Sequence, residues 1–127
     1  MKYIVETEKT VEQAVKDLEQ AVISNKFGIL HMHDLKATMN QKGIDFSNEC
    51  KIFEICNPKQ ANAVLTVDMS LNMALPCRIS IWQENGQVKI GTIQPTAILS
   101  SLSDSEQLKT IAKEVESIIN AIIDQAK

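Results

Sequence analysis

The chain of 127 residues is poor in aromatic side chains, in glycine and proline, and in positive charge. Aromatic residues make up 4% of it, so aliphatic side chains and methionine must build most of the hydrophobic core. Thirteen basic residues stand against sixteen acidic ones, giving a net charge of −3, and Arg78 is the one arginine. Surfaces that bind phosphate backbones are typically rich in arginine and lysine, so we expect no nucleic acid partner.

Long apolar runs are also missing. No run approaches the roughly 20 residues that a membrane helix needs, and the stretch from Met1 to Glu6 is too short and too soon charged for a signal peptide. We therefore expect a cytoplasmic protein with no membrane partner. No repeat, low-complexity tract or flexible linker divides the chain, which predicts a single domain over residues 1–127.

Cysteines and catalytic signatures are scarce as well. The three cysteines, Cys50, Cys56 and Cys77, are too few for a disulfide framework, so we expect reduced thiols, with a Cys56–Cys77 bridge as the alternative under oxidising conditions. The chain has no glycine-rich phosphate loop, no Gly-x-Ser-x-Gly and no His-Glu-x-x-His. Nucleotide hydrolysis and serine chemistry are therefore disfavoured, and no cofactor is expected.

Two segments have the pattern of long amphipathic helices. The first begins at a capping box, Thr10 to Gln13, and ends at Ser24 to Lys26. The second begins at a box over residues 103–106 and keeps an apolar stripe in helical phase to about Gln125. Two shorter helices are also predicted. The first covers Leu35 to Met39, with Asp34 as its N-cap and Gly43 as the left-handed residue after its end. The second begins at Pro58, with Asn57 as its N-cap and Gln60 completing a capping box, and ends at residues 66–68.

Five segments are predicted to be strands: 1–6, 27–33, 51–56, 78–83 and 87–93. The last two form a hairpin around Asn85-Gly86, a pair suited to a tight turn. In the second strand, alternation would place Ile29, His31 and His33 on one face and Leu30 and Met32 on the other. Two long helices on one face of a five-stranded, mostly antiparallel sheet give an α+β two-layer sandwich. The other face, bearing Ile29 or Trp82, is then free for a dimer partner or a ligand.

Several spaced motifs together resemble the family called domain of unknown function 302. They are Phe27-Gly28-Ile29-Leu30, Asp34-Leu35-Lys36-Ala37-Thr38-Met39, Cys56-Asn57-Pro58 with Ala61, Leu75-Pro76-Cys77 and Gln94-Pro95-Thr96-Ala97-Ile98-Leu99. The resemblance spans nearly the whole chain. It implies a β-α-β4-α fold like that of the TATA-binding protein, and a homodimer. It implies no activity, and His31 and His33 lie outside its motif positions.

The chemistry of the chain is concentrated at two corners where a thiol lies beside a proline: Cys56-Asn57-Pro58 and Leu75-Pro76-Cys77-Arg78. Cys56 precedes a helix N-terminus, which favours a thiolate or a bound anion. If the strands that carry them pair antiparallel, Cys56 and Cys77 come close. The plainer interpretation is that both thiols are small buried hydrophobic groups.

The charged neighbours of these corners are the remaining candidates. Glu54 shares a strand face with Cys56 and could act as a general base, although a pair with Lys51, Lys59 or Arg78 is the simpler interpretation. Arg78 could contact an anion through its guanidinium fork, or form a structural ion pair. His31 and His33 lack a third ligand for zinc, so no metal site is predicted.

Two functions therefore stay open. The favoured one is a small dimeric binding or interaction module, with an anion or small-ligand site built from Glu54, Cys56, Asn57, Pro58, Cys77 and Arg78. The alternative is a thiol-dependent or metal-assisted enzyme that uses Cys56 and Cys77. The two differ in what they ask of the thiols, because only the enzyme needs a reactive thiolate.

Overall fold

A computed structural model describes all residues from 1 to 127. Strands and helices alternate along most of the chain, and every strand expected from the sequence is present. The elements are β1 (Lys2–Thr7), α1 (Val11–Ser24), β2 (Gly28–Asp34), α2 (Leu35–Gln41), β3 (Cys50–Cys56), α3 (Pro58–Val67), the 3-10 helix η1 (Met69–Ala74), β4 (Cys77–Glu84), β5 (Gln87–Ile93), α4 (Pro95–Ser100) and α5 (Glu106–Ala126).

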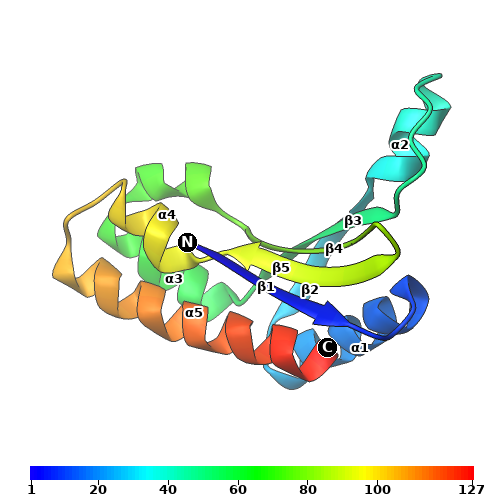
Figure 1. Ribbon diagram of the computed structural model, residues 1–127. Coiled ribbons are helices and arrows are strands. Elements are labelled where there is room, and N and C mark those ends of the chain that lie inside the picture. Colours follow the sequence, from blue (N-terminus) through cyan, green and yellow to red (C-terminus); the bar gives the residue numbers. More distant parts are fainter.

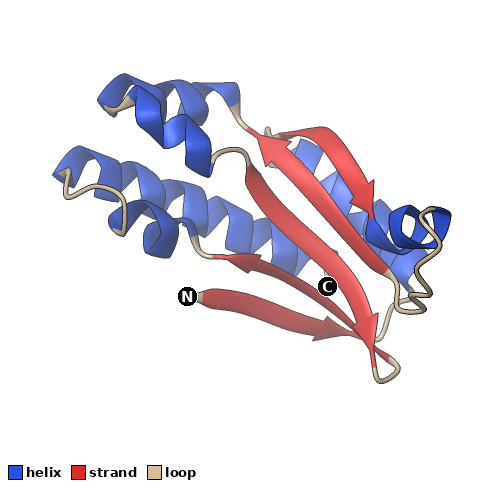
Figure 2. Ribbon diagram, turned by 90° about the horizontal axis from the view of Figure 1, so that it is seen from above, coloured by secondary structure: helices blue, strands red, loops and turns tan.

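The strands form one five-stranded sheet in the order β1-β5-β4-β3-β2, and every neighbouring pair is antiparallel. The long helices α1 and α5 contact each other beneath one face of this sheet (Figure 1). Seen from above, the strands lie in front of these two helices (Figure 2). The predicted α+β sandwich, with both long helices on one face, is therefore confirmed. None of the helices is long and apolar enough to cross a membrane.

The face of the sheet that α1 and α5 cover is the hydrophobic core. Apolar side chains from the strands meet the apolar stripes of the two helices there, and burying them supplies most of the stabilisation of the fold. The fully buried large side chains are Leu18, Val22, Phe53, Ile55, Ile79, Ile81, Ile90, Leu108, Ile119, Ile122 and Ile123.

Side chains cap the helices much as the sequence predicts. Thr10 Oγ1 accepts a hydrogen bond from the Gln13 amide at 3.1 Å, but the Gln13 side chain donates to Asp17 instead of completing a capping box. The cap of α5 is Ser105, which accepts from the Leu108 amide at 3.3 Å. The prediction of Ser103 as this cap is wrong, because its hydroxyl binds the Ser105 amide and orders the turn before the helix.

A β-bulge in β2 overturns one prediction. Ile29 lies opposite Ile55, while His31 lies opposite Glu54, so Leu30 is an extra residue in the ladder. Ile29 therefore faces the covered side and packs against the core, not beside His31. Strict alternation fails here because one inserted residue turns the side chains that follow it to the other face.

The ends of the sheet carry the shorter helices. Asn57 Oδ1 accepts from the amides of Lys59 and Gln60, as expected for the cap of α3. At the same end, η1 and α4 contact each other, and the sequence predicted neither of them. At the opposite end, α2 projects from the sheet and buries none of its residues (Figure 1).

Candidate functional site

The face of the sheet opposite α1 and α5, called here the open face, carries a mixture of apolar, small and charged side chains. Strand register identifies it, because Ile79, Ile81 and Ile90 are buried on the covered face and their neighbours along each strand point the other way. Its members are Lys2, Ile4 and Glu6 of β1, Lys89, Gly91 and Ile93 of β5, Arg78, Ser80, Trp82 and Glu84 of β4, Cys50, Ile52, Glu54 and Cys56 of β3, and His31 and His33 of β2.

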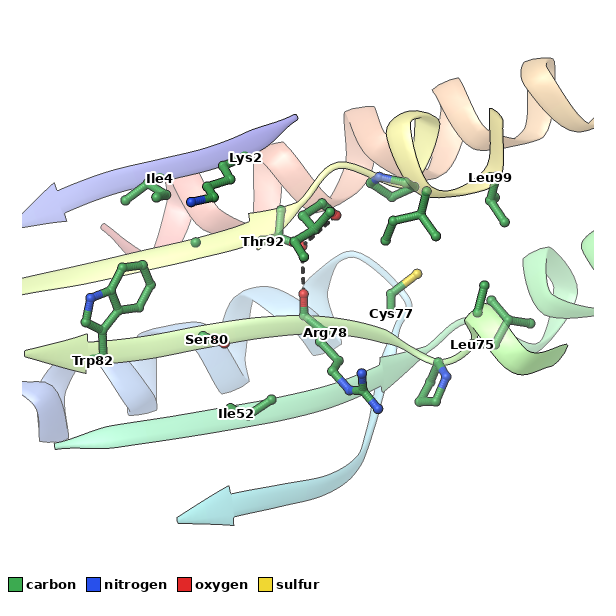
Figure 3. Close-up of a pocket in the computed structure, with 16 residues that line it drawn as sticks. Lys2, Ile4, Ile52, Leu75, Cys77, Arg78, Ser80, Trp82, Thr92 and Leu99 are labelled. Atoms are coloured by element: carbon green, nitrogen blue, oxygen red, sulfur yellow. Dashed lines mark hydrogen bonds between the residues drawn. The ribbon is translucent and has the colours of Figure 1, made fainter. Parts of the chain in front are cut away.

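A groove of about 400 Å³ lies on this face and extends toward η1 and α4 (Figure 3). This volume falls within the roughly 300–1,000 Å³ range of small-molecule sites. Most of its lining is apolar, with Ser80 and Thr92 between the apolar side chains. The apolar lining comprises Ile4, Ile52, Ala74, Leu75, Pro76, Trp82, Gly91, Ile93, Pro95, Ile98 and Leu99.

Trp82, the only tryptophan of the chain, forms one end of the groove. Its indole packs over Gly91, because a Cβ added at that glycine would lie 3.2 Å from Trp82 Cη2. Its Nε1 donates to Glu84 Oε1 at 3.0 Å, and Lys89 Nζ donates to the same oxygen at 3.1 Å. The hydrogen bond from Trp82, together with Lys89, holds the pKa of Glu84 below its ordinary value. The ring is therefore fixed in position before any ligand arrives.

The opposite end of the groove is built by the segments that enter and leave the sheet. Leu75 and Pro76 lead from η1 into β4, while Leu99 lies on α4. A carboxylate oxygen of Glu116 on α5 accepts hydrogen bonds from the Thr96 amide at 3.1 Å and the Thr96 hydroxyl at 2.6 Å. Helix α4 is thus tied to α5, which holds the wall of the groove in place.

Two cations line the groove, and no acidic residue does. None of the ion pairs within the chain involves Lys2. Arg78 contacts Glu54 through one nitrogen at 3.4 Å, and its side chain is 62% exposed. Such a long, exposed pair contributes little to stability. Because the guanidinium has five donors, most of its hydrogen-bonding capacity stays free for another acceptor.

The two thiol corners lie on neighbouring strands but face different ways. Cys77 lies opposite Ile55 in the β3–β4 ladder, so Cys56 is one residue beyond its partner and points to the other face of the sheet. Cys77 lines the groove with its sulfur directed toward α4, away from the Arg78 side chain (Figure 3). Burial, with a smaller contribution from Cys56, raises the pKa of the Cys77 thiol to about 11. All three cysteines are free.

Of the site residues that the sequence predicted, Cys77 and Arg78 line the groove, whereas Glu54, Cys56, Asn57 and Pro58 do not. Glu54 lies between Arg78 and His33, whose Nε2 is 3.5 Å from Glu54 Oε1. Asn57 caps α3 and also donates to the Lys26 carbonyl at 3.3 Å, and Pro58 begins that helix. The Cys56-Asn57-Pro58 corner therefore does not form part of the groove wall.

The histidines of β2 lie together on the open face. The ring centroids of His31 and His33 are 4.5 Å apart and meet edge to face. Both side chains lie on the same face of β2, as predicted, because the bulge precedes both residues and does not change the alternation between them. No three His, Cys, Asp or Glu side chains converge where they could share a metal ion.

Sequence reasoning missed much of the lining, including Lys2, Ile4, Ile93, Ile98 and Leu99. The alternation in β1 does carry a signal, since Lys2 and Ile4 share one face of that strand. No helix is predicted from the sequence over residues 94–100, although Pro95 at the start of α4 is a local signal for a helix N-terminus.

Comparisons with known proteins agree on one family. Residues 3–126 match the family model described as Domain of unknown function DUF302. The chain is also similar to the crystal structure of an uncharacterized conserved DUF302 protein from Bacillus stearothermophilus, with 31% sequence identity and a TM-score of 0.94. That similarity covers 99% of this chain and 98% of the other. A comparison with curated proteins found no match.

Proposed function

Because the chain belongs to the DUF302 family, whose description names no activity, we propose a function from the site itself: the protein is a binding module that holds a small molecule in the open-face groove. The observation that carries this proposal is a mainly apolar groove of about 400 Å³ with two cations and no carboxylate in its lining. Apolar concavities with a few polar groups are the usual form of small-molecule sites.

Rigidity supports this choice of site. Trp82 is held by Glu84 and packs over Gly91, and the α4 wall is tied to α5 through Glu116. A groove whose walls are already ordered loses little conformational entropy on binding. The groove also uses the Leu75-Pro76-Cys77-Arg78 corner, which the sequence singled out.

The thiol enzyme alternative is the weaker one. At neutral pH, a thiol with a pKa near 11 is almost entirely protonated and is a poor nucleophile. Glu54, the proposed general base, is engaged by Arg78 and His33 and does not line the groove. Nothing in the arrangement would draw the proton from Cys77.

The test of the binding function uses Trp82 as a reporter, because the only tryptophan of the chain lies in the groove. A library of small fragments is titrated while tryptophan emission is recorded. We expect a subset of fragments to shift the emission of the wild type and to leave the Ser80→Phe variant unchanged, because a phenyl ring at position 80 fills the centre of the groove. Ser24→Phe, at the exposed C-terminal end of α1, is the matched control and keeps binding. If no fragment shifts the emission, the proposal is wrong.

We further propose that the binding module is a homodimer, with the second copy covering the arm formed by α2 and residues 42–49. Helix α2 has seven residues and buries none of them, although isolated helices shorter than about 12–15 residues are marginal in water. Ile44, beside it, is 56% exposed. A two-fold interface would bury this exposed patch on both copies at once.

Light scattering coupled to size-exclusion chromatography tests the dimer. The wild type is expected at twice the monomer mass of 14.1 kDa. The double variant Met39→Lys/Ile44→Asp is expected at the monomer mass, and Ser24→Lys, at an exposed position of α1 outside the arm, serves as its control and stays dimeric. A monomeric wild type at tens of micromolar would overturn the homodimer and leave the groove proposal standing.

A further inference from the structure

We propose that the ligand of the groove is an amphiphilic monoanion, an apolar body with one carboxylate or comparable acid group, taken up as a free small molecule. This inference rests on the proposed binding function and specifies the ligand class for that same groove. Neither the family description nor the related structure names a ligand.

The apolar body of the ligand is inferred from the apolar side chains on the floor of the groove, between Trp82 and the end of the sheet that carries η1 and α4. Ile4 and Ile93 are 46% and 54% exposed, although both lie on strands of the central sheet. Ile52 lies opposite Ser80 on the neighbouring strand β3, and Trp82 lies two residues beyond Ser80 on β4, on the same face of the sheet. Covering such a floor with an apolar ligand would remove these side chains from water, at roughly 25 cal/mol for each Å² buried.

The acid group is inferred from the distribution of charge. The chain as a whole carries −3, yet its groove is lined by Lys2 and Arg78 and by no carboxylate. Lys2 has no ion-pair partner in the chain, and Arg78 has only its exposed 3.4 Å contact with Glu54. An anionic ligand gains attraction from both cations without displacing a strong internal pair, whereas a cationic ligand would be repelled.

Strand register places the two cations at the same end of the floor. Lys2 lies opposite Ile93 in the β1–β5 ladder. Ser80 lies opposite Gly91 in the β4–β5 ladder, and the same register continued by two residues sets Arg78 level with Ile93. Figure 3 shows Lys2 and Arg78 on strands to either side of Thr92, with the Lys2 side chain directed toward Ile4, the Arg78 side chain directed toward β3, and Trp82 further along the sheet. The arrangement thus orients a ligand, with its acid group at the Lys2–Arg78 level and its body toward Trp82.

The experiment compares three probes of equal chain length by quenching or shift of Trp82 emission: decanoate and decyltrimethylammonium below their micelle concentrations, and decanol below its solubility limit. We expect decanoate to bind at least tenfold more tightly than decanol, and decyltrimethylammonium to bind more weakly than decanol. Tenfold corresponds to about 1.4 kcal/mol, a modest demand on two cations.

Variants identify the groups responsible. Lys2→Gln and Arg78→Gln are each expected to weaken decanoate binding severalfold, and the double variant to bring it to the affinity of decanol. Decanol binding should not change in any of them. Lys59→Gln, which removes an exposed cation at the same end of the sheet but outside the groove, is the matched control.

The outcomes separate this inference from the proposed function. Equal affinity for decanoate and decanol, or unchanged decanoate binding in the double variant, overturns the anionic class while leaving a groove that binds small molecules. A response to phosphatidylglycerol vesicles with none to free decanoate overturns the free-ligand assignment, because the acid group would then belong to a bilayer. If neither these probes nor any fragment of the library changes the emission of Trp82, the proposed binding function itself is wrong.

Discussion

The two faces of one sheet have been put to different use. On the covered face, Phe53, Ile55, Ile79 and Ile81 are at most 2% exposed and pack against α1 and α5. On the open face of the same strands, Ile52, Glu54, Arg78 and Ser80 remain at least partly accessible, and no long helix covers them. Alternation along each strand separates the residues that stabilise the fold from those that remain accessible, so adjacent residues can be changed with different consequences. Four predictions test this separation by chemical denaturation followed by far-ultraviolet circular dichroism, a signal that variants without Trp82 also give.

The largest effect is expected for Ile81→Ala on the covered face. Ile81 is fully buried and lies opposite Ile90, so the truncation removes apolar contacts and leaves a cavity. We expect the free energy of unfolding to fall by about 2–5 kcal/mol. Ile4→Ala, at a position on the open face that is 46% exposed, should cost clearly less. Similar losses at the two positions would contradict the separation of the faces.

The second largest loss of stability is expected for Gly91→Ala, which adds one methyl group to the floor of the groove. The new Cβ would lie 3.0 Å from Ile4 Cγ1, 3.1 Å from the Tyr3 carbonyl oxygen and 3.2 Å from Trp82 Cη2. We expect a loss of about 1–3 kcal/mol from overpacking, together with altered Trp82 emission. In the Trp82→Phe background the smaller ring should relieve part of the strain, which a double-mutant cycle would detect as coupling. Strict additivity would show that the ring does not lie over Gly91.

A third prediction concerns Cys77, which lies in the register of the covered face yet lines the groove. Its thiol has a pKa of about 11 in the folded protein, against an ordinary value of 9.0. A raised pKa means that the native state retains the proton longer than the unfolded chain. This contribution to stability is therefore complete below pH 9 and is lost as the pH rises toward 11.

The measurement compares the wild type with Cys77→Ala at pH 8 and at pH 10.5. The wild type should lose more stability than the variant over this interval, by on the order of 1–2 kcal/mol. Iodoacetamide should label Cys77 slowly at pH 8 in the native state and quickly after unfolding. Rapid native labelling at pH 8 would contradict this and favour the thiol enzyme.

The smallest effect on stability is expected for Arg78→Gln on the open face. Its contact with Glu54 is a single long pair with a side chain that is 62% exposed, so unfolding should change by less than about 0.5 kcal/mol. The same change is expected to weaken binding of an anionic probe severalfold. A stability loss above about 1 kcal/mol would instead assign Arg78 a structural role.

The elements that sequence reasoning predicted well are those whose signals are local. The stripes of α1 and α5, the Asn57 cap and the Asn85-Gly86 turn each depend on residues within one or two turns of chain, and the structure confirms them. The failures have two causes. The bulge at Leu30 depends on how β2 pairs with β3, whereas the choice between Ser103 and Ser105 as the cap of α5 is a local one between two serines two residues apart.

The candidate site was predicted only in part, for the same reason that the bulge was missed. Cys77 and Arg78 were marked by the unusual Leu75-Pro76-Cys77-Arg78 segment, and they do line the groove. Lys2 and Leu99 do not belong to a segment with a thiol beside a proline, so they were not selected from the sequence. They meet the corner only because β1 lies beside β5 and α4 returns past the end of the sheet.

The two-layer sandwich follows from local signals in the sequence, because amphipathic period and helix caps act between near neighbours and leave each element one face to bury. The groove on the open face between Trp82 and α4, and the position of Lys2 and Arg78 at the same level of the sheet, arise only when the whole chain is folded. Such a groove depends on strand order and register across more than ninety residues, from Lys2 to Leu99, and these follow from the packing of the whole chain.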